Sequence, residues 1–166
     1  MPEVVSTQTS LAQWLALNPG SLILQPDQSF IKSYDSTFKF EDGKDRSKLT
    51  GTDSLSWKDK SWVIGVRAGQ HRKAFDWNQL KKERLIHDKI GITPVLVVIS
   101  KDDKSFFAFE SLGPGNISMI NDTIVANNKH FRIDGKGIDT NFSLKPLPAS
   151  LEFWHSWRTF NPGTLY

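Results

Sequence analysis

The amino-acid sequence predicts a β-rich α+β fold, in which antiparallel hairpins and a meander sheet are flanked by short helices. Two observations lead to this prediction. Short runs of β-branched and aromatic residues recur along the chain and are separated by Gly, Asn and Asp, which favour tight turns. The C-terminal end instead carries large aromatic residues at helical spacing, at Phe153, Trp154, Trp157 and Phe160.

The composition is that of a globular protein. The 166 residues include 38% hydrophobic and 23% charged residues, which suffices for an ordinary core, so we expect residues 1–166 to form one soluble domain. The longest apolar run, Val95–Ile99, is far shorter than the roughly 20 residues of a membrane-spanning helix, so no membrane span is expected. The first residues show no signal peptide, and the compartment stays open.

Charge and cysteine content exclude several classes of function. The net charge is only +3, and the basic residues are scattered apart from the run at 81–84, so no nucleic-acid partner is expected. The absence of cysteine excludes disulfides, thiolate metal sites and cysteine nucleophiles. The histidines lack the short spacing of metal ligands, and we predict neither a metal site nor a cofactor.

The N-terminal third is expected to be mostly irregular. Ser10 and Gln13 have the spacing of a capping box, which predicts a short helix that ends at Asn18-Pro19-Gly20. Leu22–Leu24 is a candidate strand. Residues 25–60 are polar and contain scattered glycines, so they are predicted to be mostly loop.

The middle of the chain predicts two hairpins and a helix. Residues 62–66 and 72–75 are strand-like runs joined by a turn at 68–70. Asp76 is placed to cap a short helix over 77–84. Val95–Ile99 is β-branched enough to be an interior strand, and residues 105–110 return beside it after a polar turn.

Three further strands and a helix are predicted near the C-terminus. Residues 117–120, 123–126 and 130–133 are short strand candidates separated by Asn- and Asp-containing turns, as in a meander. Residues 145–148 should be extended and lead into the closing helix, whose broad aromatic face must be buried against the rest of the protein.

One repeat links the two ends of the chain. Residues 14–22 and 157–165 share Trp, Asn-Pro-Gly, a hydroxyl residue and Leu at the same spacing, so the element at 9–22 recurs in the element at 150–166. Both copies fit a helix that ends at Asn, before Pro, with Gly allowing the chain to leave in extended form. Two interpretations stay open: one unit of a tandem array, or two similar helix ends that pack at opposite edges of one domain.

Three stretches of the sequence together resemble one protein family. They are Trp62–Gly69 with Lys73–Phe75, His87-Asp88 with Gly91–Val98, and Leu144–Ala149 with Phe153–Trp157 and Asn161–Thr164. In order and spacing they are similar to the prokaryotic domain of unknown function 3179 family. Members of that family often carry a Cys-Pro-x-Cys segment after the Val-rich strand, where this chain has Ser100–Asp103.

The resemblance implies a copy without the cysteine chemistry of its relatives, and therefore a degenerate, structural or binding copy. The family's pattern has Asn-Asp after the helix predicted at 77–84, and this chain has His87-Asp88 there, so a role inherited at that position does not follow. The resemblance itself implies no activity. It does suggest a bacterial, extracytoplasmic protein.

Two groups of side chains are candidates for a site. An imidazole beside a carboxylate can act as a base or bind a metal, which makes Lys73, His87 and Asp88 the candidate polar site. Adjacent residues of a strand point to opposite faces, so His87 and Asp88 are not expected to act as a pair. Aromatic rings flanked by Asp, Asn and Lys suit a sugar or another flat-faced ligand, which makes Trp57, Trp62 and Trp77 the candidate aromatic platform.

No phosphate loop, dinucleotide fingerprint or nucleophile elbow is present in the sequence. The leading hypothesis is therefore a non-catalytic binding or interaction module with an unidentified ligand or protein partner. One alternative is an enzyme or metal-assisted site around His87 and Asp88. The other is a structural repeat of a larger extracytoplasmic protein.

Overall fold

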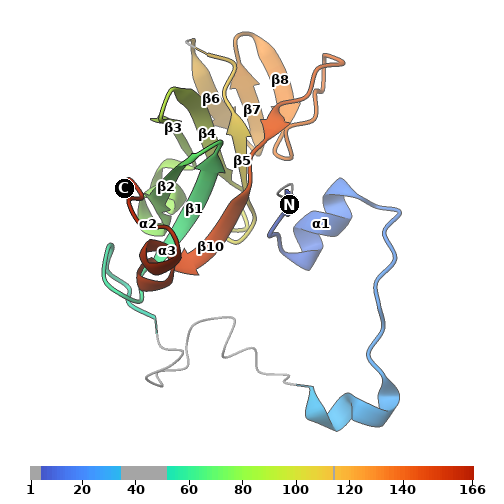
Figure 1. Ribbon diagram of the computed structural model, residues 1–166. Helices are drawn as coiled ribbons and strands as arrows, with labels where there is room; N and C mark the ends of the chain where they lie inside the picture. The colour runs from blue at the N-terminus through green and yellow to red at the C-terminus, as the bar shows by residue number, and fades with distance from the viewer. Residues whose placement is uncertain (1–4, 35–51, 114) are drawn as a thin grey trace.

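The computed structural model describes residues 5–34, 52–113 and 115–166 and confirms a β-rich fold of antiparallel strands with short helices (Figure 1). The helices are α1 (Leu11–Leu17), the 3-10 helix η1 (Gln28–Ser33), α2 (Trp77–Glu83) and α3 (Trp154–Phe160). The strands are β1 (Trp62–Ala68), β2 (His71–Asp76), β3 (Leu85–Ile90), β4 (Thr93–Ile99), β5 (Phe106–Glu110), β6 (Ile117–Ile120), β7 (Thr123–Ala126), β8 (Lys129–Arg132), β9 (Lys145–Pro146) and β10 (Ala149–Phe153). Within these ranges no helix has the length and apolarity to cross a membrane.

The strands form three sheets. Sheet A has the order β10-β1-β2, sheet B the order β3-β4-β5-β9, and sheet C the order β6-β7-β8. Figure 1 shows sheet C at one end of the molecule, with β10 and α3 at the other. Sheet C is the predicted meander, and its three strands lie close to the predicted ranges.

Sheet B lies between the other two sheets, so its strand β4 is buried on both faces. Val95, Val97 and Ile99 pack in one core cluster with side chains of sheet A and α2. Leu96 and Val98 alternate with them and pack in a second cluster with side chains of sheet C. Full burial of each such side chain is worth about 1.5–3 kcal/mol relative to exposure. The prediction of an interior strand at 95–99 is confirmed.

The predicted hairpins are also confirmed. β1 pairs with β2 through a tight turn at Gly69, whose φ of +59° suits glycine, and β4 pairs with β5 after the polar turn. β3 extends the second hairpin through a turn at Gly91. Asp76 caps α2 by accepting hydrogen bonds from the backbone N–H groups of Asn78 and Gln79, as predicted.

At the N-terminus, α1 begins and ends as predicted. Ser10 is its N-cap and accepts a hydrogen bond from the backbone N–H of Gln13 at 3.1 Å. The predicted strand at Leu22–Leu24 is wrong: these residues pair with no described strand, and Leu22 is 100% exposed. An apolar run forms a strand only where a sheet edge is available to pair with it. Of the predicted loop, residues 35–51 lie outside the described residues.

The C-terminal end required one correction. The chain forms β10 before α3, and β10 pairs along β1, so Phe153 belongs to a strand rather than to the helical face. Phe160, the last residue of α3, was predicted to lie on the buried face but is 75% exposed. The buried aromatic face is therefore Trp154 and Trp157, which pack on the outer face of sheet A. Pairing with a strand some 85 residues away is a tertiary effect that local spacing does not reveal.

Candidate functional site

A cleft of about 510 Å³ opens where the ends of sheets A and B meet α2. Its apolar lining consists of Trp62, Trp77 and Leu151. Its polar lining consists of Thr52, Asp53, Ser54, Asn78, Lys81, Asp103 and Lys104. This volume and this mixture of aromatic and polar groups are typical of small-molecule sites. Two of the three tryptophans proposed as an aromatic platform thus come together in one cleft.

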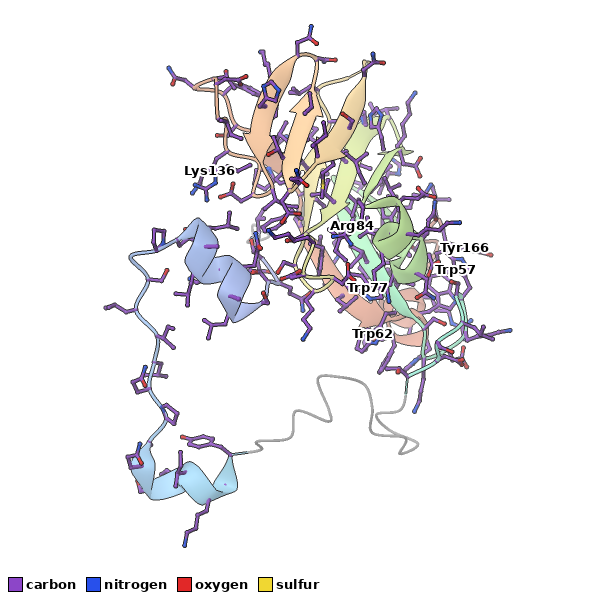
Figure 2. The ribbon with its side chains drawn as sticks, turned by 180° about the vertical axis from the view of Figure 1, so that it is seen from behind. Trp57, Trp62, Trp77, Arg84, Lys136 and Tyr166 are labelled. Carbon is purple, nitrogen blue, oxygen red and sulfur yellow. The ribbon has the colours of Figure 1, made fainter. Side chains whose placement is uncertain are left out.

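Both tryptophan rings of the cleft are fixed by an aromatic neighbour. Trp62 is the first residue of β1, and its ring stacks on Phe153 of β10, directly opposite, with ring centroids 4.1 Å apart. Trp77 is the first residue of α2, and its ring meets Phe106 edge-on at 5.9 Å. Figure 2 shows Trp62 and Trp77 at the same end of the sheets. Because both rings are held in place, little side-chain entropy is lost when a ligand contacts them.

The polar wall of the cleft is held together by hydrogen bonds at the start of α2. The Asn78 side chain donates to the Ser54 carbonyl at 3.0 Å and to the Ser56 hydroxyl at 3.2 Å. The Ser56 hydroxyl in turn donates to the Asp76 carboxylate at 2.7 Å. The segment at 52–56 is therefore tied to the helix that carries Trp77.

Two cations lie at this cleft. Lys81 and Lys104 form no ion pair with any residue in the described part of the chain, whereas Asp103 pairs with the guanidinium of Arg84. The second carboxylate of the cleft belongs to Asp53. Since Arg84 neutralises Asp103, the side chains around the cleft leave an excess of positive charge.

The turn at Ser100–Asp103 carries a network of hydroxyls and carboxylates. Asp102 accepts hydrogen bonds from the hydroxyls of Ser10 and Ser105 at 2.7 and 2.6 Å. It also accepts from the backbone N–H groups of Lys104 and Ser105. Ser100 donates to Asp122 at 2.8 Å. The turn therefore joins α1 to the turn between β6 and β7, and its residues Asp103 and Lys104 form one side of the cleft.

The hydrogen bonds to Asp102 lower the pKa of its carboxyl group. Partial burial alone would raise the pKa of the Asp102 carboxyl, but the hydrogen bonds from Ser10, Ser105 and the backbone outweigh burial and hold the pKa below its ordinary value. Asp102 is therefore ionised at neutral pH, and its role is to accept hydrogen bonds.

Trp57, the third predicted platform residue, lies outside the cleft. Its ring contacts Trp154 edge-on at 5.2 Å and Tyr166 at 5.3 Å, and Figure 2 shows it beside Tyr166. Trp57 packs with Trp154 and Trp157 in the cluster on the outer face of sheet A. The ring is thus part of the packing around α3.

The candidate polar site divides into two pairs. Lys73 of β2 and Asp88 of β3 form an ion pair at 2.8 Å, which links sheets A and B. The His87 imidazole instead forms a 3.0 Å hydrogen bond, between its Nε2 and the hydroxyl of Ser111. Partial burial favours a higher pKa for Asp88, but Lys73, the backbone N–H of Lys89 and the nearby His87 together lower it.

The sequence does not indicate that Ser111 contacts His87, because Ser111 lies 24 residues further along the chain, directly after β5. A serine–histidine hydrogen bond resembles the first link of a hydrolytic triad, but within the described ranges no carboxylate is hydrogen-bonded to the other imidazole nitrogen. The described residues also contain no group of three or more His, Asp or Glu side chains arranged to hold a metal.

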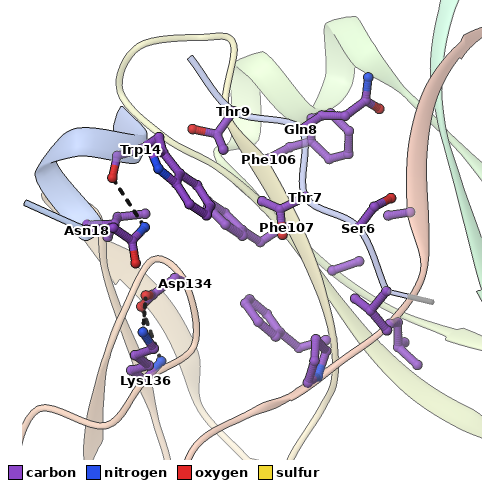
Figure 3. A pocket seen from close by; sticks show the side chains of 17 residues that line it. Ser6, Thr7, Gln8, Thr9, Trp14, Asn18, Phe106, Phe107, Asp134 and Lys136 are labelled. Atoms are coloured by element: carbon purple, nitrogen blue, oxygen red, sulfur yellow. Dashed lines mark hydrogen bonds and ion pairs between the residues drawn. The ribbon is translucent and has the colours of Figure 1, made fainter. Parts of the chain in front are cut away.

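A second cleft, of about 360 Å³, lies under α1 (Figure 3). Trp14 and Leu17 of α1 line one side, and the phenylalanines of β5 line another. The segment at 5–9 borders it and is bound to sheet A, because Gln8 accepts a hydrogen bond from the backbone N–H of Leu151 at 2.7 Å.

No curated protein and no solved structure matches the chain. Residues 1–164 do match the model of one family, and the matched range includes the strands, the cleft and most of both copies of the repeat. The chain therefore belongs to the family described as Protein of unknown function (DUF3179).

Proposed function

We propose that this chain is a non-catalytic binding module that takes a flat-faced ligand, such as a sugar ring, in the cleft between Trp62 and Trp77. The single observation that carries the proposal is that two tryptophans from distant parts of the sequence line one cleft of small-molecule size.

The surroundings of the two rings support a saccharide. Sugar rings present an apolar face that packs on aromatic side chains, and hydroxyls at the ring edge that need donors and acceptors. The cleft offers both kinds of group, because Asn78, Asp53 and Lys81 lie beside the rings. Lys81 and Lys104, which form no ion pair within the described ranges, further favour a ligand with a negative substituent, such as a uronic acid.

The position of the cleft in the fold also supports the proposal. The turn between β4 and β5, where the family resemblance implies a Cys-Pro-x-Cys segment, forms one side of the cleft through Asp103 and Lys104. This chain has no cysteine beside its cleft, which fits a module that binds its ligand without reacting with it.

The test is a titration of the full chain with neutral and acidic oligosaccharides, followed by tryptophan fluorescence and calorimetry. Trp62→Ala and Trp77→Ala are each expected to weaken binding at least about tenfold, as expected for loss of an aromatic anchor. Lys81→Ala and Lys104→Ala are expected to weaken binding of acidic ligands more than that of neutral ones.

Trp14→Ala is the matched control, because it removes an indole that lies outside this cleft. It is expected to leave affinity unchanged. The proposal is wrong if no oligosaccharide binds at millimolar concentration, or if folded Trp62→Ala and Trp77→Ala proteins bind as tightly as the unsubstituted chain.

A further inference from the structure

The two copies of the repeat have the same local structure. In each, a seven-residue helix ends at Asn, whose backbone N–H and side-chain amide both donate to the carbonyl of the Trp four residues earlier. In each, the indole N–H of that Trp donates at 2.8 Å to the hydroxyl seven residues later, Ser21 in one copy and Thr164 in the other. The indole is therefore bonded to the turn after the helix in the same way in both copies, although Gly163 has a positive φ of +76° and Gly20 does not.

The C-terminal copy is docked on a sheet. Trp157 is 0% exposed and lies on β1 at Gly65, where a Cβ atom would come within 2.0 Å of the indole. Arg67, on the same strand, places its guanidinium 5.4 Å from the ring centroid. Leu165 then joins the edge of β2, donating to the Arg72 carbonyl at 3.2 Å and accepting from the backbone N–H of Ala74 at 2.9 Å.

The N-terminal copy presents the same groups without such a sheet. Trp14 is 43% exposed, and Leu22, the counterpart of Leu165, is 100% exposed. No backbone hydrogen bond joins Leu22–Leu24 to another described segment. The chain beyond α1 instead runs away from the sheets (Figure 1).

Strand β5, which lies next to α1, does not offer Trp14 a glycine site like the one that β1 offers Trp157. Strand β5, which faces Trp14 across the second cleft, presents phenylalanines where β1 presents Gly65 (Figure 3). The ring cannot approach the β5 backbone as Trp157 approaches β1, and the cleft of about 360 Å³ is left between them.

The differences between the copies also fit a shared docking role. Six positions differ between residues 12–22 and 155–165, and none of the six is buried in the C-terminal copy. The Trp and Asn that are buried there, at 157 and 161, are kept at 14 and 18. Of the two indoles that α3 packs on the sheet, Trp157 is shared, and Trp154 has another apolar residue, Leu11, as its counterpart.

We propose that residues 10–24 are a sheet-docking unit whose partner is another unit of this same fold with a vacant sheet A. The partner's recognition surface consists of a strand with a glycine between β-branched residues, which admits the Trp14 indole, and an open neighbouring strand edge, which pairs with Leu22–Leu24. Burial of the indole and these apolar residues supplies the attraction, and the strand edge fixes the orientation.

The test creates that vacant surface in the full chain. The double substitution Trp157→Gly with Leu165→Gly removes the indole that rests on Gly65 and the side chain at the edge of β2, which weakens the docking of α3. We expect this variant to self-associate with increasing concentration in sedimentation velocity, because residues 10–24 of one molecule occupy the vacated surface of another. Adding Trp14→Ala is expected to weaken this association at least about tenfold.

A folded double variant that stays monomeric overturns the proposal, and so does association that Trp14→Ala leaves unchanged. If circular dichroism shows the double variant unfolded, a second variant decides. It carries the sequence of residues 12–22 at 155–165, through His155→Ala, Ser156→Gln, Arg158→Leu, Thr159→Ala, Phe160→Leu and Thr164→Ser. We expect Trp157 to stay buried by fluorescence, with Tm lowered by less than about 5 °C. Exposure of that indole, as in Trp157→Ala, overturns the proposal.

Discussion

The helices α1 and α3 carry the same motif and end in the same way, yet one exposes its tryptophan and the other buries it completely. The hydrogen bonds around the two Asn caps and the two indoles match, so local sequence determines how each helix ends. Burial is determined elsewhere, by Gly65 on β1, which lets one indole reach the strand backbone. Similar local structure can therefore contribute very different stability, according to the surface on which it packs.

The sharpest test of this comparison removes each indole in turn. Trp157→Ala is expected to lower the free energy of unfolding by about 3–5 kcal/mol, since it leaves a large cavity between α3 and sheet A. Trp14→Ala should cost less than about 1 kcal/mol, because the ring is already partly in water. Urea unfolding of both variants measures the difference, and equal losses would show that α1 is docked as firmly as α3.

The second test adds an atom where α3 rests. Gly65→Ala is expected to destabilise the protein by about 1–3 kcal/mol, because the new methyl group overlaps the Trp157 ring. The cost should largely disappear when Trp157→Ala is also present, which double-mutant analysis would detect. Gly20→Ala in the N-terminal copy is the control, as a Cβ there meets no atom within 4 Å. If the losses in unfolding free energy of the two single variants simply add in the double variant, the Trp157 indole does not rest on Gly65.

The third test compares the two Asn caps. Asn161 is 1% exposed, and its amide donates to the Trp157 carbonyl at 2.9 Å, so Asn161→Ala should cost about 1–3 kcal/mol by leaving that carbonyl with fewer donors. The same bond at Asn18 is 3.2 Å long and exposed to water, which can replace it. Asn18→Ala should therefore cost less than about 0.5 kcal/mol. Thermal unfolding monitored by circular dichroism checks both values, and similar costs would weaken the contrast between buried and exposed copies.

The comparison also explains which features the sequence could predict. The hairpin turns at Gly69 and Gly91, the Asp76 cap and both Asn-Pro-Gly helix ends depend on neighbouring residues, and each is where the sequence predicts a turn, a cap or a chain break. β4 was predictable as an interior strand because its residues are apolar on both faces.

The features that failed depend on segments far apart in the chain. β10 forms because β1 pairs with it, and Leu22–Leu24 stays unpaired because none of the strands that the structure describes offers it an edge. The same reason limits the candidate site. Asp, Asn and Lys residues near the tryptophans suggested a ligand platform, but only the meeting of β1 with α2 places Trp62 and Trp77 in one cleft and leaves Trp57 outside it.

The smallest expected effect concerns how α1 is attached. Asp102 accepts a hydrogen bond from the Ser10 hydroxyl, so it fixes the N-cap of α1 to the turn between β4 and β5. The attachment of α3 differs, because its N-cap Phe153 makes no side-chain cap bond and Asp59 instead pairs with Arg158 within the helix. Asp102→Asn should loosen α1 at a cost of about 1 kcal/mol. Asp103→Asn is the control, since Asp103 pairs with Arg84 rather than with α1.

Acid should have the same selective effect as Asp102→Asn. The pKa of Asp102 is lower in the folded protein than its ordinary value of 3.8, so the unfolded chain binds this proton more readily. The stability that Asp102 contributes is therefore fully present well above pH 3.8 and is lost as the pH falls through the lower, folded pKa. Asp88 also has a lowered pKa, so β2 and β3 lose part of their link in the same range, and only a local probe separates the two effects. In a protein whose tryptophans all carry fluorinated indoles, the ¹⁹F resonance of Trp14 should shift below pH 3.8 while that of Trp157 stays unchanged. Simultaneous shifts would mean that both helices leave the sheets together.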